Sequence, residues 1–130
     1  MRNAIEQAIT DAIRAIEFLK HPESLQFIEQ VSEVIATCFN RGGKVLIAGN
    51  GGSLCDALHF AEELTGQFRD KRKALPALAF ADPGHMSCVA NDFGFAEVFA
   101  RNVEAFGVPG DLFIALTTSG NSLNLTKAVH

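Results

Sequence analysis

The chain has 130 residues, of which 48% are hydrophobic, and a formal net charge of −4. This length fits one domain at most, and the hydrophobic share supports a packed core and excludes a disordered chain. No run approaches the ~18 apolar residues of a membrane span, and the short basic run at residues 69–73 is typical of a solvated turn. Neither a membrane nor a nucleic acid is therefore expected as a partner.

The amino terminus and the cysteines indicate the compartment. The first residues alternate charged with apolar side chains, unlike a signal peptide. Cys38, Cys55 and Cys88 are odd in number and have no CxxC spacing. We therefore expect a cytoplasmic protein with reduced, buried thiols, in which Cys55 and Cys88 pack in the core rather than act as nucleophiles.

Two amphipathic helices are expected before any strand. Isoleucines at steps of three or four predict a helix over residues 3–20, which ends before Pro22 because proline does not fit a helix interior. The same apolar spacing then continues to Gly42 and Gly43, a helix stop. A doubly wound domain does not need this helical pair, so we expect residues 1–43 to help build a homo-oligomer.

From residue 44 onward, apolar runs alternate with helical patterns. Strands are expected at residues 44–48, 74–80 and 112–116, and helices at 53–64, 85–90, 95–106 and from 121 onward. The alternation predicts an α/β core over residues 44–130, with a doubly wound parallel sheet. Three strands make a thin sheet and the last helix runs barely two turns, so we expect a fragment of a longer domain, truncated after the third strand.

Two turns rich in glycine and hydroxyl groups follow the first and third of these strands. A helix N-terminus exposes unpaired N–H groups that attract an anion, and glycine lets the backbone approach it closely. The turns match neither a Walker A loop nor the full dinucleotide fingerprint, which leaves a phosphorylated small molecule as the expected ligand. The candidate binding residues are Asn50, Gly51, Gly52, Ser53, Thr118, Ser119 and Ser122.

Candidate catalytic and metal-binding residues stand on the helix after the first turn. His59 and Glu63 are four residues apart and share a helix face, so they could bind a metal, act as an acid/base pair, or form an ordinary surface contact. Asn91 and Asp92 stand in a polar turn before a helix, where they could cap that helix or point at a substrate. The sequence spacing of these residues does not distinguish a functional site from a surface contact or a helix cap.

Together these motifs resemble the sugar isomerase (SIS) domain family. The resemblance covers nearly the whole chain and is densest at residues 49–53, 55–57, 59–66, 91–95 and 118–122. It implies a flavodoxin-like SIS fold and a cytoplasmic homotetramer with active sites between subunits. The implied activity is an aldose–ketose isomerisation of sedoheptulose 7-phosphate to D-glycero-D-manno-heptose 7-phosphate, in bacterial heptose and lipopolysaccharide-core biosynthesis.

The resemblance also implies roles for single residues. The phosphate would be held by four hydroxyl side chains, those of Ser53, Thr118, Ser119 and Ser122. Glu63 would carry the proton between C1 and C2, with Asp92 as a further catalytic group, and His59 and Glu63 would be two zinc ligands. The remaining ligands, a late glutamine and histidine, are absent here, so the chain alone is expected to be inactive. Leu54 and Gln67 also depart from the family pattern, which has histidine and arginine there.

Two other functions remain open on the same fold. One is a non-catalytic binding protein, such as the SIS relative that associates with a replication initiator, and the other is a sugar-phosphate sensor. The carboxylate of Glu63 favours the isomerase. Glu63 lies about 15 Å along the helix from Ser53, so we expect the two to serve one site either through an extended seven-carbon substrate or from different chains.

Overall fold

The computed structural model describes residues 1–130, which form two compact units, Met1–Ala36 and Thr37–His130. The first unit contains α1 (Arg2–Phe18) and most of α2 (Pro22–Asn40). The predicted helical pair is confirmed, with Pro22 as the first residue of α2, where its missing N–H costs nothing. No residue of α1 is buried.

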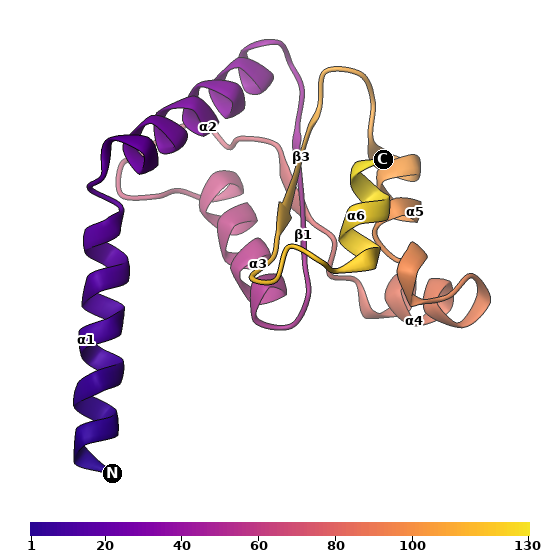
Figure 1. Ribbon diagram of the computed structural model, residues 1–130. Helices are drawn as coiled ribbons and strands as arrows, with labels where there is room; N and C mark the ends of the chain where they lie inside the picture. Colours follow the sequence, from indigo (N-terminus) through magenta and orange to yellow (C-terminus); the bar gives the residue numbers. More distant parts are fainter. The chain divides into compact units, whose positions relative to one another are not determined.

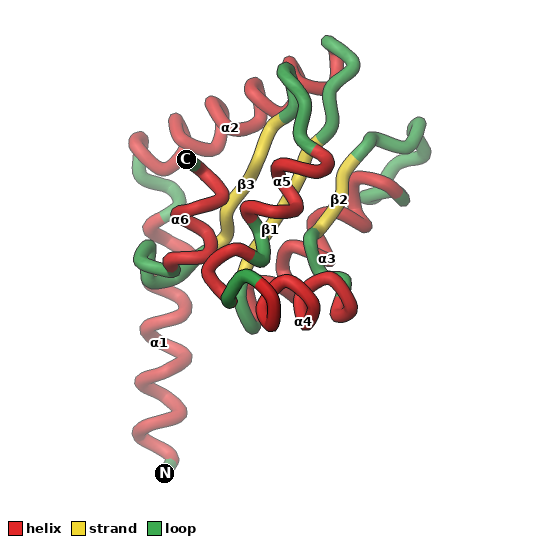
Figure 2. The backbone as a smooth tube through the Cα atoms, turned by 90° about the vertical axis from the view of Figure 1, so that its right-hand side faces the viewer, coloured by secondary structure: helices red, strands yellow, loops and turns green.

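The second unit contains a parallel sheet of three strands, β1 (Val45–Gly49), β2 (Ala77–Ala79) and β3 (Leu112–Leu116), in the order β2-β1-β3 (Figure 2). All five residues of β1 are buried, as expected of a central strand covered on both faces. The register pairs Gly49 with Leu116, so the last residues of β1 and β3 lie side by side at one edge of the sheet.

Helices cover both faces of this sheet, which confirms the doubly wound prediction (Figures 1 and 2). Helix α3 (Gly52–Thr65) packs on one face through Ala57 and Ala61. The other face carries α4 (Pro83–Asp92), the 3-10 turn η1 (Phe95–Glu97), α5 (Ala100–Phe106) and α6 (Leu123–Val129). The main core lies on this second face and contains Leu46, Ala48, Phe80, Val89, Val98, Phe99, Leu125 and Ala128.

Three predicted elements differ from the structure. Strand β2 is shorter than residues 74–80, although Pro76 O and Phe80 N still bond to β1. The helix expected over 95–106 is divided into η1 and α5 at Val98 and Phe99, both fully buried. Helix α4 extends beyond residues 85–90 at both ends. It starts earlier because Asp82 caps it, accepting a bond from His85 N at 2.6 Å.

The buried-thiol expectation is correct only for Cys38. Cys55 and Cys88 are exposed, because they stand on the outward faces of α3 and α4 rather than toward the sheet. None of the helices combines the length and the continuous apolar character that a membrane span requires.

Candidate functional site

The two turns lie together at the carboxyl edge of the sheet, as predicted. They line one cavity of about 60 Å³, whose walls are Asn50, Ser53, Leu116, Thr117, Thr118, Ser119 and Ser122. The reason is topological, since parallel strands end at the same edge and Gly49 is paired with Leu116. Hydroxyl and amide groups from both turns therefore face one small space.

Glycine is required where the first turn enters α3. A Cβ on Gly49 would lie 2.5 Å from Ser53 O, so a larger residue would push the start of α3 away from β1. Gly51 has a φ of +56°, in the region that favours glycine. Gly51 and Gly52 are the cap and first residue of α3 and shape the turn, whereas Asn50 and Ser53 supply the polar groups of the cavity wall.

The second turn is held by its own side chains. Thr117 Oγ1 accepts a hydrogen bond from Gly120 N at 3.1 Å, and Ser119 Oγ accepts one from Asn121 N at 3.2 Å. Ser122 stands at the cap position of α6, where its hydroxyl makes no capping bond and remains available to a ligand. The turn is thus formed before any ligand binds, with Thr118 and Ser122 on the cavity wall.

A reciprocal amide pair joins the first turn to α6. Asn50 Nδ2 donates to Asn124 Oδ1 at 2.9 Å, and Asn124 Nδ2 donates to Asn50 Oδ1 at 2.8 Å. Asn124 is buried, so both of its bonds form away from solvent. The pair fixes the distance between the two turns. Asn124 is not among the residues that the sequence motifs predicted, and its only local signal is a polar residue between Leu123 and Leu125.

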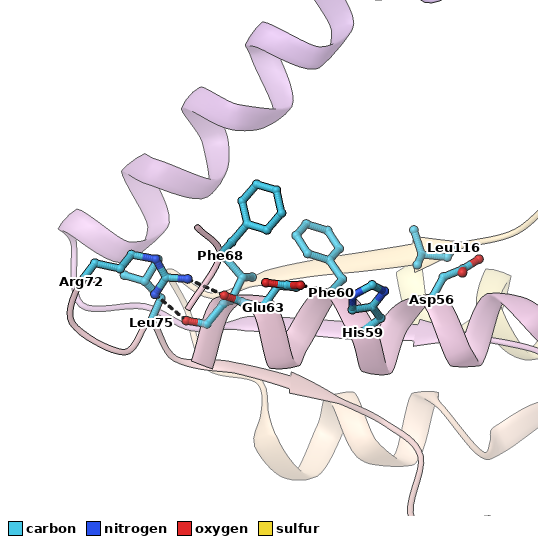
Figure 3. A pocket seen from close by; sticks show the side chains of 9 residues that line it. Asp56, His59, Phe60, Glu63, Phe68, Arg72, Leu75 and Leu116 are labelled. Carbon is cyan, nitrogen blue, oxygen red and sulfur yellow. Dashed lines mark hydrogen bonds and ion pairs between the residues drawn. The ribbon is translucent and has the colours of Figure 1, made fainter. Parts of the chain in front are cut away.

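A second, larger cavity lies along α3 (Figure 3). Its volume is about 650 Å³, and its lining residues are Asp56, His59, Phe60, Glu63, Leu64, Phe68, Arg72, Leu75 and Leu116. His59 Nε2 lies 3.2 Å from Glu63 Oε1, so the predicted i, i+4 contact is made. The Glu63 side chain is 32% exposed and the His59 side chain 71%, which leaves both open to a ligand in this cavity.

The same helix face offers three metal-ligating atoms. One atom from each of His59, Glu62 and Glu63 lies within 4.8 Å of the other two, and Glu62 Oε1 is 3.6 Å from His59 Nε2. An imidazole nitrogen and two carboxylate oxygens are donors that zinc accepts. The residues therefore fit part of a zinc site, whose fourth position these three do not fill.

The two cavities adjoin at one residue. Leu116, the last residue of β3, lines both the small cavity of the turns and the large cavity of Glu63. Within a single chain, an extended ligand with its anion at the turns would pass Leu116 to reach Glu63. The backbone positions of Ser53 and Glu63 are about 15 Å apart along the axis of α3.

Asn91 and Asp92 lie in the last turn of α4, not in the polar turn that the sequence predicted. Asn91 Nδ2 donates to Asp92 Oδ1 at 2.8 Å, and Cys88 Sγ lies 3.6 Å from Asp92 Oδ2. Both side chains are exposed, and neither lines the two cavities described above. The structure does not bring them to Glu63 or to the two turns.

The opposite edge of the sheet contains a partly buried ion pair between Lys44 and Asp111. The Asp111 carboxylate accepts hydrogen bonds from Lys44 Nζ, from Lys44 N at 2.9 Å and from Val108 N at 2.9 Å. Burial raises the pKa of the Asp111 carboxyl, but these hydrogen bonds and the charge of Lys44 together hold that pKa below its ordinary value of 3.8. This pair joins the start of β1 to the turn before β3.

The amino-acid sequence is similar to that of a known protein family and of several named proteins. The SIS domain family model matches residues 7–130. The phosphoheptose isomerase of Fusobacterium nucleatum is 53% identical over 114 residues, which are 88% of this chain and 59% of that protein. The phosphoheptose isomerase of Vibrio cholerae is 49% identical over 130 residues, which are 99% of this chain and 68% of that protein.

Solved structures show the same likeness. The phosphoheptose isomerase GmhA from Neisseria gonorrhoeae matches with a TM-score of 0.88 at 35% identity, and a phosphoheptose isomerase from Francisella tularensis with 0.89 at 36%. Each match covers 98% of this chain and 66% of the solved chain. The chain thus spans about three fifths to two thirds of the length of these relatives.

Proposed function

Because the chain belongs to the SIS domain family, we propose that the protein is an aldose–ketose isomerase of a phosphorylated heptose. The reaction would interconvert sedoheptulose 7-phosphate and D-glycero-D-manno-heptose 7-phosphate, which feeds bacterial heptose and lipopolysaccharide-core synthesis. The proposal is supported by relatives named phosphoheptose isomerase at about half identity. The observation that carries it is the carboxylate of Glu63 in an open cavity that adjoins the hydroxyl-lined turns at Leu116.

The chemistry requires a base beside two carbons. An aldose–ketose exchange removes a proton from the carbon next to a carbonyl and returns it to the neighbouring carbon, by way of an enediol. A carboxylate within hydrogen-bond reach of C1 and C2 can carry that proton. Glu63 is two-thirds buried and faces the cavity, and the nearby imidazole of His59 orients its carboxylate through the 3.2 Å contact.

The other end of the substrate would bind at the two turns. The hydroxyls of Ser53, Thr118, Ser119 and Ser122 would donate to the phosphate oxygens. A seven-carbon chain would extend from there along α3 toward Glu63. Asn91 and Asp92 lie away from this path, so their proposed roles with the substrate require a movement of α4 or a second subunit.

A zinc ion and a tetramer belong to the proposal as well. His59, Glu62 and Glu63 would hold the metal, which when bound polarises a sugar oxygen. Equilibrium dialysis tests this, because His59→Ala should abolish zinc binding.

Wide apolar stripes on α1 and α2 support a homotetramer, and a stable monomer in sedimentation would contradict it. A cytoplasmic location, as the family resemblance implies, is part of the proposal, and cell fractionation tests it.

Glu63→Gln tests the reaction itself. The amide keeps the shape of the side chain but cannot accept the proton, so turnover in the full-length protein should fall by about a hundredfold or more. Folding and phosphate binding should stay nearly unchanged, because Glu63 lies outside the small cavity. Glu33→Gln, an exposed position on α2, is the control.

Two results would contradict the proposal. Near-normal turnover in Glu63→Gln would place the base elsewhere, and no turnover in the unmodified full-length protein would favour the alternatives of a binding protein or a sensor. Those alternatives need sugar-phosphate binding or partner association without conversion of the sugar.

A further inference from the structure

The guanidinium group of Arg72 donates to three backbone carbonyls, two of which lie at the end of α3. Arg72 Nη1 donates to Leu64 O at 2.8 Å, and Nη2 donates to Glu63 O (Figure 3). Nη1 also donates to Lys73 O at 2.9 Å. One side chain from the loop between α3 and β2 thus holds the backbone of Glu63 itself.

The last turn of α3 needs such a partner. The final carbonyls of a helix have no intrahelical donor, and Gly66 does not take the left-handed conformation that usually closes a helix. Glu62 O accepts from Gly66 N at 2.7 Å, and Leu64 O accepts from Leu75 N at 3.0 Å as well as from Arg72. Among the hydrogen bonds beyond the helix, Glu63 O has only the bond from Arg72.

We propose that Arg72 is a positioning residue for Glu63, and this role rests on the isomerase activity proposed above. The guanidinium fixes the last turn of α3, and so fixes where the Glu63 carboxylate stands against the reacting carbons. The positive charge also suits the negative end of the helix dipole. A reacting group displaced by about 1 Å can lose a hundredfold in rate, so a frayed last turn would reduce the chemical step strongly.

The effect on Glu63 can be separated from an effect on the cavity wall. Arg72 also orders the loop that carries Phe68 and Leu75, two apolar residues of the large cavity. Loss of that wall would weaken substrate binding and raise KM, whereas misplacement of Glu63 would lower kcat. The phosphate end of the substrate binds at the other cavity and should not change.

The fork of the guanidinium is the chemical feature that matters. Nη1 and Nη2 reach neighbouring carbonyls at once, and an ammonium group on a flexible chain cannot reproduce that planar geometry. Arg72→Lys should therefore recover only part of the rate. Guanidinium ion added to Arg72→Ala should restore part of it too, because it can occupy the vacated position.

The test compares Arg72→Ala, Arg72→Lys and Lys71→Ala in the full-length protein. Lys71→Ala removes a positive charge from the same exposed loop and makes none of these bonds. For Arg72→Ala we expect kcat to fall about tenfold to a hundredfold, with KM for the heptose phosphate changed less than threefold. Hydrogen exchange should accelerate in the last turn of α3 in Arg72→Ala, less so in Arg72→Lys and not in Lys71→Ala. Added guanidinium should raise kcat of Arg72→Ala but not of Glu63→Gln.

Results that contradict the role of Arg72 differ from results that contradict the isomerase activity. A kcat for Arg72→Ala equal to that of Lys71→Ala, a rise in KM alone, or a loss of kcat that guanidinium does not restore would each overturn the positioning role while the isomerase activity stands. No turnover in the unmodified protein would instead overturn the proposed function, and the role of Arg72 with it.

Discussion

The pair of Asn50 and Asn124 offers a direct test of how the two turns are held together. Two hydrogen bonds of 2.9 and 2.8 Å join these side chains across 74 residues of sequence. Asn124 is 3% exposed, whereas Asn50 is half-buried and within reach of water. We therefore expect Asn124→Ala to loosen α6 from the first turn, with water replacing part of what Asn50 loses.

The magnitude follows from these contacts. Each hydrogen bond contributes about 0.5–1.5 kcal/mol to stability, so the loss of both should lower the free energy of unfolding by about 2 kcal/mol. At about 4 °C per kcal/mol for a domain of this size, Tm should fall by about 8 °C. The double variant Asn50→Ala/Asn124→Ala should lose little more than either single variant, which gives a coupling energy of about 1–2 kcal/mol.

Urea unfolding of the four proteins in the cycle measures this coupling. Asn102→Ala is the matched control, because Asn102 is also buried but its side chain donates only to Val98 O, at 3.3 Å. It should cost about 1 kcal/mol and combine additively with Asn50→Ala. A coupling between Asn50 and Asn124 below about 0.3 kcal/mol, within the error of additivity, would refute the claim that this pair holds the turns together.

Two further predictions concern the ligand turn and the opposite edge of the sheet. Ser119→Ala should weaken sugar-phosphate binding by about 1–3 kcal/mol, the loss expected for one hydrogen bond to a charged group, and unchanged affinity in calorimetry would remove Ser119 from the phosphate site. Asp111→Asn should lower the unfolding free energy at pH 7 by about 2–3 kcal/mol. Because the folded pKa of Asp111 lies below 3.8, its stabilisation is complete above that pH and is lost as pH falls through the lower value. The difference in unfolding free energy between the unmodified protein and Asp111→Asn, measured by urea unfolding, should therefore shrink below about pH 4. A difference that stays constant to the lowest accessible pH would contradict the stabilising role of the Asp111 carboxylate.

Local pattern was sufficient for the order of the elements and for the meeting of the two turns. The change from helical spacing to short apolar runs marked β1 and β3 closely, because a strand buried on both faces must be apolar throughout. Parallel strands end at one edge, so turns after β1 and β3 had to lie together there. The His59–Glu63 contact likewise follows from helix geometry alone, which places residues four apart on one face.

Contacts between distant segments determined three features that the local sequence does not predict. Nothing local to Arg72 shows that its guanidinium binds the carbonyl of Glu63, nine residues earlier, because the path of the loop between α3 and β2 determines it. Pairing of Asn50 with Asn124 depends on the packing of α6 against the core. The helical spacing over residues 95–106 was overridden where Val98 and Phe99 enter that core. In each case the sequence determined which groups could bond or bury, and the packing of distant segments determined which of them did, since those contacts form only when the sheet brings the segments together.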